Sequence, residues 1–243
     1  MPHADVEIAR AQLLEIAPGG FEEIDGEGWV ELAVYTDEAG VARIREDFVA
    51  ATVRRVEAGW EDRWREFHRP IRAGGLWIGP PWEPPPPGEA AVVVDPGRAF
   101  GTGAHATTRA CIELLSTLER GSMLDAGCGS GVVAVAATRL GFGPVVAVDL
   151  DAIAVDVARD TARRNGVQID VRRVDVLRDD LLRADVVVAN IELAVVEALL
   201  ERDPARTAVT SGYLAGETPR APSWSVVARL ELEGWAAHVL RAK

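Results

Sequence analysis

The feature that most constrains this chain is a glycine-rich turn between a predicted strand and a predicted helix. Residues 125–131 read D-A-G-C-G-S-G; the strand ends at Asp125, and a helix is expected from Gly131 to Leu140. Glycines let the backbone approach a ligand closely, and a helix begins with N–H groups that have no partner within the helix. The turn therefore predicts a cofactor-binding loop.

Predicted strands and helices alternate along the chain from about residue 90. Asp151 is typical of a helix N-cap and Asn165-Gly166 of a helix end, so a helix is expected between them. Strands are expected at 144–148, 169–174, 184–189 and 205–211, with a closing hairpin within 224–240. This alternation predicts an α/β fold with a parallel, doubly wound sheet.

Three zones divide the chain. Residues 1–56 are predicted to form a small α+β domain, with strand-like alternation over 29–35. Residues 57–89 are predicted to be a linker, with Trp60, Trp64 and Phe67 at helical spacing and six prolines within 80–87 that favour an extended spacer. Residues 90–243 hold the alternating strands and helices, and are predicted to form the cofactor-binding domain.

The composition disfavours several classes of protein. The 243 residues are 48% hydrophobic and carry a formal net charge of -12, which favours a packed core and disfavours nucleic-acid binding. The apolar stretches fall short of the roughly 20 residues of a membrane span, and the N-terminus lacks a signal-peptide pattern. Cys111 and Cys128 have neither disulfide-framework nor zinc-ligand spacing. We therefore expect a cytoplasmic protein with no metal site, no membrane contact and no direct nucleic-acid partner.

Acidic residues at the ends of predicted strands narrow the choice of cofactor. Asp125, Asp149 and Asp175 each end a strand. Asp149 is suited to accept both hydroxyls of a ribose, whereas Asp175 is either an adenine contact or a solvated turn residue. A nicotinamide dinucleotide is the alternative cofactor, but Val132 stands where its third glycine is expected. Because an acid beside the loop suits a positively charged sulfonium, S-adenosyl-L-methionine is favoured.

This pattern resembles the class I S-adenosylmethionine-dependent methyltransferases, and residues 95–109 narrow the resemblance. They read D-P-G-R-A-F-G-T-G-A-H-A-T-T-R, similar to the D-P-G-x-A-F-G-T-G-x-H-x-T-T segment of the PrmA family, whose members methylate ribosomal protein L11. The resemblance implies a Rossmann-like seven-stranded class I methyltransferase sheet with a small N-terminal α+β domain. It also implies S-adenosyl-L-methionine as cofactor and lysine and α-amino groups of ribosomal protein L11 as acceptors.

Residue chemistry and the resemblance together indicate the site. Phe100 lies in a Phe-Gly-Thr-Gly loop suited to close over a cofactor, and Thr107 and Thr108 are expected to cap the following helix. Asn190 and Glu192 are the catalytic candidates: the first holds the acceptor amine, and the second either accepts a proton, attracts the acceptor's charge or is simply exposed. Expected cofactor contacts are Phe100, Thr107, Thr108, Asp125, Gly127, Gly129, Asp149, Asp175 and Asn190. His105 is either a base or a structural hydrogen-bonding residue.

Three functional hypotheses follow. The chain methylates ribosomal protein L11, or it methylates another protein or small molecule, or it binds S-adenosyl-L-methionine without activity. Residues 190–193 read N-I-E-L where the family usually has N-I-L-A, which puts a carboxylate beside the expected acceptor pocket. The acids Asp125 and Asp149 favour an enzyme. We expect a monomer whose residues 1–56 recognise the protein substrate.

Overall fold

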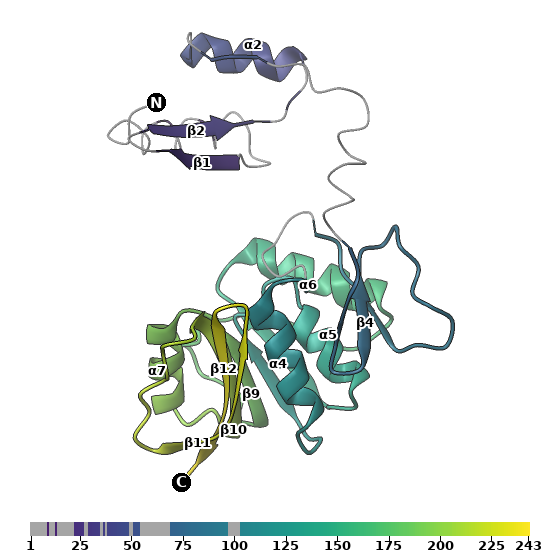
Figure 1. The fold of residues 1–243 in the computed structure, drawn as a ribbon, viewed down its shortest axis with the longest axis vertical. Coiled ribbons are helices and arrows are strands. Elements are labelled where there is room, and N and C mark those ends of the chain that lie inside the picture. Colours follow the sequence, from purple (N-terminus) through teal and green to yellow (C-terminus); the bar gives the residue numbers. More distant parts are fainter. Residues whose placement is uncertain are drawn as a thin grey trace. The chain divides into compact units, whose positions relative to one another are not determined.

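The structure is a computed structural model that describes most of the chain. It describes residues 9, 13, 22–26, 29–34, 36, 38–48, 51–53, 69–96 and 103–243. The chain divides into two compact units, Met1–Trp60 and Glu61–Lys243 (Figure 1), and each is described by itself.

The smaller unit contains a two-stranded hairpin and a helix. Strand β1 (Glu22–Gly26) pairs antiparallel with β2 (Trp29–Ala33), and α2 (Glu38–Asp47) follows. Strand β2 lies within the segment whose alternation predicted a strand, and its Val30 is buried. The unit therefore has the α+β character expected of it.

A three-stranded sheet opens the described part of the larger unit. Strand β3 (Ile71–Ala73) pairs antiparallel with β4 (Leu76–Gly79), which pairs parallel with β5 (Ala91–Val93). The proline-rich segment lies between β4 and β5. Leu76, Ile78 and Val92 are buried in the same core as the helices of the larger unit, because both strands are apolar. Residues 69–96 thus pack into this unit, where the sequence indicated a spacer.

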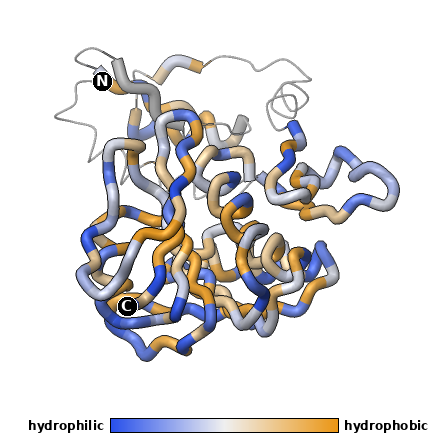
Figure 2. Tube along the Cα trace, turned by 60° about the horizontal axis from the view of Figure 1, so that its bottom comes forward, coloured by the Kyte–Doolittle hydropathy of each residue, from blue (hydrophilic) through white to orange (hydrophobic). Residues whose placement is uncertain are grey.

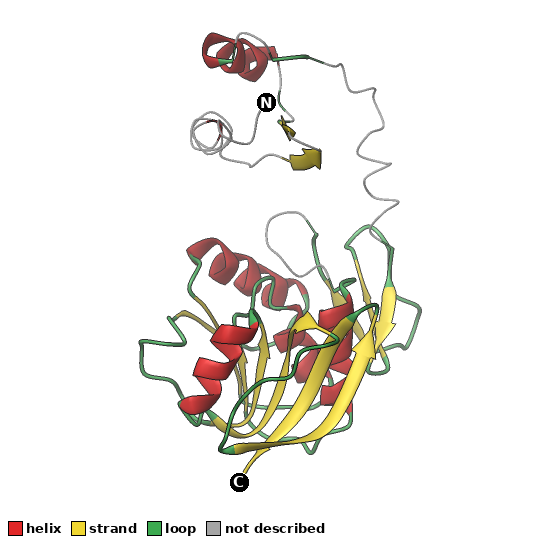
Figure 3. Ribbon diagram, turned by 60° about the vertical axis from the view of Figure 1, so that its left-hand side comes forward, coloured by secondary structure: helices red, strands yellow, loops and turns green. Residues whose placement is uncertain are grey.

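The main sheet has seven strands in the order β11-β12-β10-β9-β6-β7-β8 (Figures 1 and 3). Strand β12 runs antiparallel to β10 and β11, and the pairings among β10, β9, β6, β7 and β8 are parallel. The bounds are β6 Met123–Ala126, β7 Val145–Asp149, β8 Asp170–Arg173, β9 Ala184–Asn190, β10 Ala205–Leu214, β11 Trp224–Leu232 and β12 Trp235–Ala242. The predicted α/β sheet and closing hairpin are confirmed.

Among the described residues, four helices cover the two faces of this sheet. They are α4 (Ala106–Ser116), α5 (Val132–Arg139), α6 (Ala152–Arg164) and α7 (Leu193–Glu201). Alternate strand residues point to opposite faces: Met123 joins the core cluster that contains α4, α5 and part of α6, while Leu124 joins the cluster that contains α7. In Figure 2 the central strands are mostly hydrophobic, as strands covered on both faces must be.

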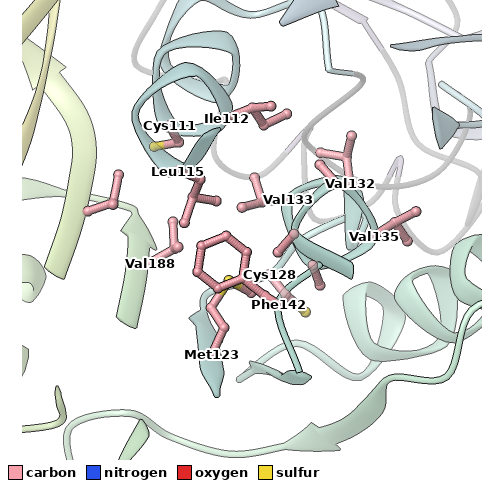
Figure 4. Close-up of a cluster of buried hydrophobic side chains, with 14 of the residues drawn as sticks. Cys111, Ile112, Leu115, Met123, Cys128, Val132, Val133, Val135, Phe142 and Val188 are labelled. Carbon is pink, nitrogen blue, oxygen red and sulfur yellow. The ribbon is translucent and has the colours of Figure 1, made fainter. Parts of the chain in front are cut away.

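The first of these clusters gathers around Phe142. Figure 4 shows this ring beside Met123 of β6, with Leu115 and Cys111 of α4 and Val133 of α5 around them. All five side chains are buried. This packing fixes α4 and α5 against β6, and so fixes the turn between β6 and α5.

Among the described residues, no helix is both long and apolar enough to cross a membrane.

Candidate cofactor and acceptor site

Three strands bring the predicted site residues to one edge of the sheet. In the parallel register, Ala126 of β6 pairs with Val148 of β7 on one side and with Ala189 of β9 on the other. The next residue along each strand is Gly127, Asp149 or Asn190. The register therefore sets these three residues side by side at the carboxyl end of the sheet, where open α/β sheets bind ligands.

The glycine turn is held close to β7 by the backbone. The N–H groups of Gly127 and Cys128 both donate to the carbonyl oxygen of Val148, at 2.8 and 3.0 Å. Gly131 has a φ of 76°, and a Cβ there would lie 3.0 Å from the Cα of Ala158 in α6. Glycine at 131 thus allows α5 to begin close to α6. The predicted close approach of the glycine turn to a ligand stays a prediction.

Asp149 is fixed by two backbone donors. Its Oδ2 accepts from the N–H of Gly129 at 2.9 Å, and its Oδ1 accepts from the N–H of Asp151 at 3.0 Å. A carboxylate has about four acceptor positions, so each oxygen keeps capacity for one hydroxyl. Asp151 itself accepts from the N–H of Ile153 at 2.9 Å and caps α6 as predicted.

Asp125 is a fully buried acid with one orphaned oxygen. Its side chain is 2% exposed, and Oδ2 has no hydrogen-bond partner among the described residues. Burial raises the pKa of Asp125 to about 7; a hydrogen bond from the backbone of Ala134 opposes this, and the charge of Asp149 adds to it. Such a group is ready to meet a positive charge at the glycine turn.

Thr108 and Asn190 come together across the sheet edge. The Asn190 amide, at Nδ2, donates to Oγ1 of Thr108 at 3.3 Å, which leaves its carbonyl oxygen available. Thr107 and Thr108 are buried in the first turn of α4, so the prediction that they cap this helix is wrong. The N-cap is His105, whose Nδ1 accepts from the N–H of Thr107 at 3.4 Å and lies 2.7 Å from its Oγ1. The structural reading of His105 is the one that these contacts bear out.

Glu192 immediately precedes α7 and is exposed. Its side chain makes no capping hydrogen bond in this described part of the chain. It lines an open pocket of ≈ 380 Å³ whose other lining residues are Leu193, Ala194, Glu197, Gly212, Tyr213, Leu214, Glu217 and Trp235. A catalytic role for Glu192 stays a prediction.

Two of the predicted cofactor-binding residues, Asp175 and Phe100, have no described contact with Gly127, Asp149 or Asn190. Oδ1 of Asp175 accepts from the N–H of Leu177 at 2.9 Å, and its carboxylate lies 3.6 Å from Arg178, as in an ordinary turn. Phe100 lies outside the described residues. Their cofactor roles stay predictions.

Trp235 was not predicted as a site residue. Its ring meets the His105 ring edge-to-face, with centroids 5.0 Å apart, and it lines the pocket of Glu192. Arg109 of α4 pairs with Glu233 just before β12. In the sequence, the Glu-Gly-Trp triplet at 233–235 indicates a turn followed by an aromatic residue. Nothing in this triplet indicates that the turn contacts α4, which is distant in sequence.

Comparison with known sequences gives a consistent assignment. The family profile described as "Ribosomal protein L11 methyltransferase (PrmA)" matches residues 31–237. A ribosomal protein L11 methyltransferase of Symbiobacterium thermophilum is 42% identical over 180 residues, which are 68% of this chain and 59% of that relative. One of Pelotomaculum thermopropionicum is 48% identical over 116 residues, which are 46% and 38% of the two chains. The chain thus spans three fifths or less of the curated relatives it matches.

Comparison with solved structures agrees. A ribosomal protein L11 methylase of Lactobacillus delbrueckii subsp. bulgaricus superposes with a TM-score of 0.66 at 25% sequence identity. The match covers 72% of this chain and 100% of that one. The sheet order and the helices on both its faces are therefore those of a known fold.

Proposed function

We infer the function from kinship and site together: the chain belongs to the ribosomal protein L11 methyltransferase (PrmA) family, and we propose that it transfers methyl groups from S-adenosyl-L-methionine to a protein. The observation that carries this proposal is the junction of β6, β7 and β9. This junction places the glycine turn, the Asp149 carboxylate and the buried acid Asp125 beside the Asn190 amide. Asp149 can accept ribose hydroxyls, and Asn190 can hold an amine.

The residues present fit this cofactor. The open acceptor positions of Asp149 suit two ribose hydroxyls, and the orphaned oxygen of Asp125 suits a nearby positive charge. Gly127 and Gly129 have no side chain, so the cofactor can approach their backbone closely. Thr108 lies at the same edge of the sheet, where it accepts a hydrogen bond from Asn190. When bound, the cofactor supplies an electrophilic methyl group on a sulfonium.

The acceptor side depends on Asn190. A lysine or α-amino group must be neutral to attack, and free lysine has a pKa of about 10.4, so the site must favour the uncharged amine. The Asn190 carbonyl oxygen accepts from an N–H, which orients the nitrogen lone pair away from it. We propose that Glu192, at the N-terminus of α7, attracts the incoming cation or takes its proton.

We propose ribosomal protein L11 as the acceptor, since the relatives carry that name. The formal net charge of -12 suits a basic partner. We further propose that residues 1–56 recognise the substrate and that residues 90–243 perform the transfer, in the cytoplasm and as a monomer. The predicted linker, 57–89, lies between them in the sequence, and its residues 71–79 pack into the core of the larger unit.

The test is a transfer assay with radiolabelled S-adenosyl-L-methionine. The protein is incubated with purified ribosomal protein L11 and, separately, with an extract of its own cells, and an Asp149→Ala variant serves as control. Label on ribosomal protein L11 alone supports the proposal. Label on a different band favours the second candidate, a related methyltransferase with another acceptor, for which Glu192 in place of the family's usual residue is the favouring observation. Binding of S-adenosylhomocysteine without any transfer means a binding protein.

A further inference from the structure

Ile191 fills the space between two glycines that belong to different parts of the site. A methyl group added at Gly127 would lie 2.4 Å from Cγ2 of Ile191. One added at Gly212 would lie 2.3 Å from the carbonyl oxygen of Ile191 and 2.8 Å from its nitrogen. Carbon atoms in contact lie about 3.5–4.0 Å apart, so neither glycine tolerates a side chain while Ile191 stays in place.

The backbone of Ile191 is also anchored. Its N–H donates to the carbonyl oxygen of Ser211 at 3.1 Å, and Ser211 is the β10 residue opposite Asn190. Next to this point the pairing of β10 with β12 shifts register between Thr210 and Tyr213, and Gly212 has a φ of 99°. The irregularity in β10 therefore lies where this strand meets the backbone of Ile191, and bulges are common beside active sites.

Ile191 therefore touches the cofactor side and the acceptor side at once. Its side chain meets the glycine turn, its backbone meets the β10 bulge, and Asn190 is the residue before it. We propose that Ile191 is a positioning residue, which holds the Asn190 amide at a fixed place relative to the glycine turn. This inference rests on the proposed function for its catalytic meaning, but the positioning itself is a property of the fold.

A core-filling role and a positioning role make different predictions. Ile191 is only partly buried and packs on the α7 core cluster, as does Leu181. If Ile191 merely fills the core, then Ile191→Ala and Leu181→Ala lower the thermal midpoint alike, with no other effect. If it positions Asn190, only Ile191→Ala displaces that amide.

The experiment compares Ile191→Ala, Gly127→Ala and Gly212→Ala with the Leu181→Ala control. Two double variants combine Ile191→Ala with each of the glycine variants. Nuclear magnetic resonance follows the Asn190 side-chain amide without any ligand, and calorimetry gives the affinity for S-adenosylhomocysteine. We expect Ile191→Ala to shift the Asn190 amide signal, whereas Leu181→Ala should leave it in place. On ribosomal protein L11, kcat should fall roughly 10- to 100-fold with little change in KM, as for a misplaced reacting group.

The double variants give the sharper signature. Gly127→Ala strains a backbone with a φ of 77° and also clashes with a side-chain methyl. Adding Ile191→Ala removes the clash alone, so it should restore part of the wild-type amide position and affinity. Gly212→Ala clashes with backbone atoms, so Ile191→Ala should not relieve it. An unshifted Asn190 amide in Ile191→Ala, or equal rescue of both glycine variants, overturns the inference. If wild type methylates no acceptor while the amide and coupling results hold, the proposed function fails and the positioning role stands.

Discussion

Asp149 has two tasks at the residue scale: it fixes the glycine turn and it keeps acceptor capacity for a ribose. Asp149→Ala removes both, so S-adenosylhomocysteine binding should weaken by about 1–3 kcal/mol, the scale of hydrogen bonds to a charged group. Isothermal titration calorimetry measures this directly. Tight NADH binding by wild type, with no S-adenosylhomocysteine binding, contradicts the assignment.

Asp151 provides the matched control for Asp149. It lies two residues away and caps α6 through the N–H of Ile153. Asp151→Ala should cost about 1 kcal/mol of stability and leave cofactor affinity nearly unchanged. If both variants lose affinity equally, the effect of Asp149→Ala comes from local disorder and not from a ribose contact.

Asp125 predicts a pH dependence of stability. Its folded-state pKa is raised to about 7 by burial, above the unfolded value of 3.8. Unfolding therefore favours ionisation, and the stability contribution present below pH 3.8 is lost as pH rises through about 7. Asp125→Asn removes this loss. The difference in unfolding free energy between variant and wild type should shift in the variant's favour between pH 4 and 7, by at most roughly 4 kcal/mol.

The same acid predicts how cofactor affinity depends on pH. A cationic cofactor favours ionised Asp125, so binding below pH 7 must release a proton. Affinity for S-adenosyl-L-methionine should rise from pH 5.5 to 8 in wild type and stay nearly flat in Asp125→Asn. Calorimetry in two buffers of different ionisation enthalpy reports the released proton. No proton release at pH 6 would place the cofactor's charge away from Asp125.

Individual residues of the site were predictable to different degrees. The place of Asp149 and Gly127 at the carboxyl edge of the sheet follows from local rules, because the strands before them were predictable. The same rule does not separate them from Asp175, which makes the contacts of a turn residue. The helix cap before α4 was predicted wrongly, because threonine is a common capping residue and histidine is not, yet the His105 Nδ1 accepts the same bond. Ile191 had no signal, since its partners Gly127 and Ser211 are distant in sequence.

At the scale of elements, Asn165 joins the small sheet to α6. Its Oδ1 accepts from the N–H of Val93 in β5 at 2.7 Å, and its Nδ2 donates to the carbonyl oxygens of Val93 and Thr161 at 2.7 and 2.8 Å. Asn165→Ala removes the side-chain partners of the Val93 N–H and carbonyl groups, while the carbonyl oxygen of Thr161 keeps its bond from the backbone N–H of residue 165. The unfolding free energy should therefore fall by roughly 2–3 kcal/mol. Urea denaturation followed by circular dichroism measures it, with Gln168→Ala, at an exposed position, as control.

Asn165→Asp refines this test. A carboxylate keeps the bond from the N–H of Val93 but sets a second oxygen against two carbonyl oxygens. At pH 7 it should destabilise at least as much as alanine, and less at a pH low enough to protonate it. An aspartate variant as stable as wild type at pH 7 shows that the amide donor is dispensable.

The elements of the main sheet were predictable, and those of the small sheet were not. Strands β7 and β9 contain the apolar runs 145–148 and 186–189 between clear turn signals, and α6 has both its capping residues. Strands β4 and β5 are three or four residues long and are separated by prolines. Proline runs favour extended spacers locally, but the apolar residues on either side bury against α4 and α5, and tertiary packing decides.

At the scale of the whole molecule, the site and the two large core clusters share one unit. Every described residue of both clusters lies at position 71 or beyond, as do all the described candidates for cofactor contact. The proposed division, with recognition in residues 1–56 and chemistry in 90–243, follows from this distribution.

Deleting residues 1–56 should therefore separate binding of the cofactor from methylation of the protein. The truncated chain keeps the junction of β6, β7 and β9, so its affinity for S-adenosylhomocysteine should stay within about twofold of the full chain. Methylation of ribosomal protein L11 should be lost, because the surface proposed to recognise it is gone. A cooperative thermal transition, raised by S-adenosylhomocysteine, shows that the truncated chain is folded. If the folded truncated chain methylates ribosomal protein L11 at the full rate, recognition of the substrate lies beyond residue 56. Both the affinity for S-adenosylhomocysteine and the rate of methylation then belong to the unit that carries the site.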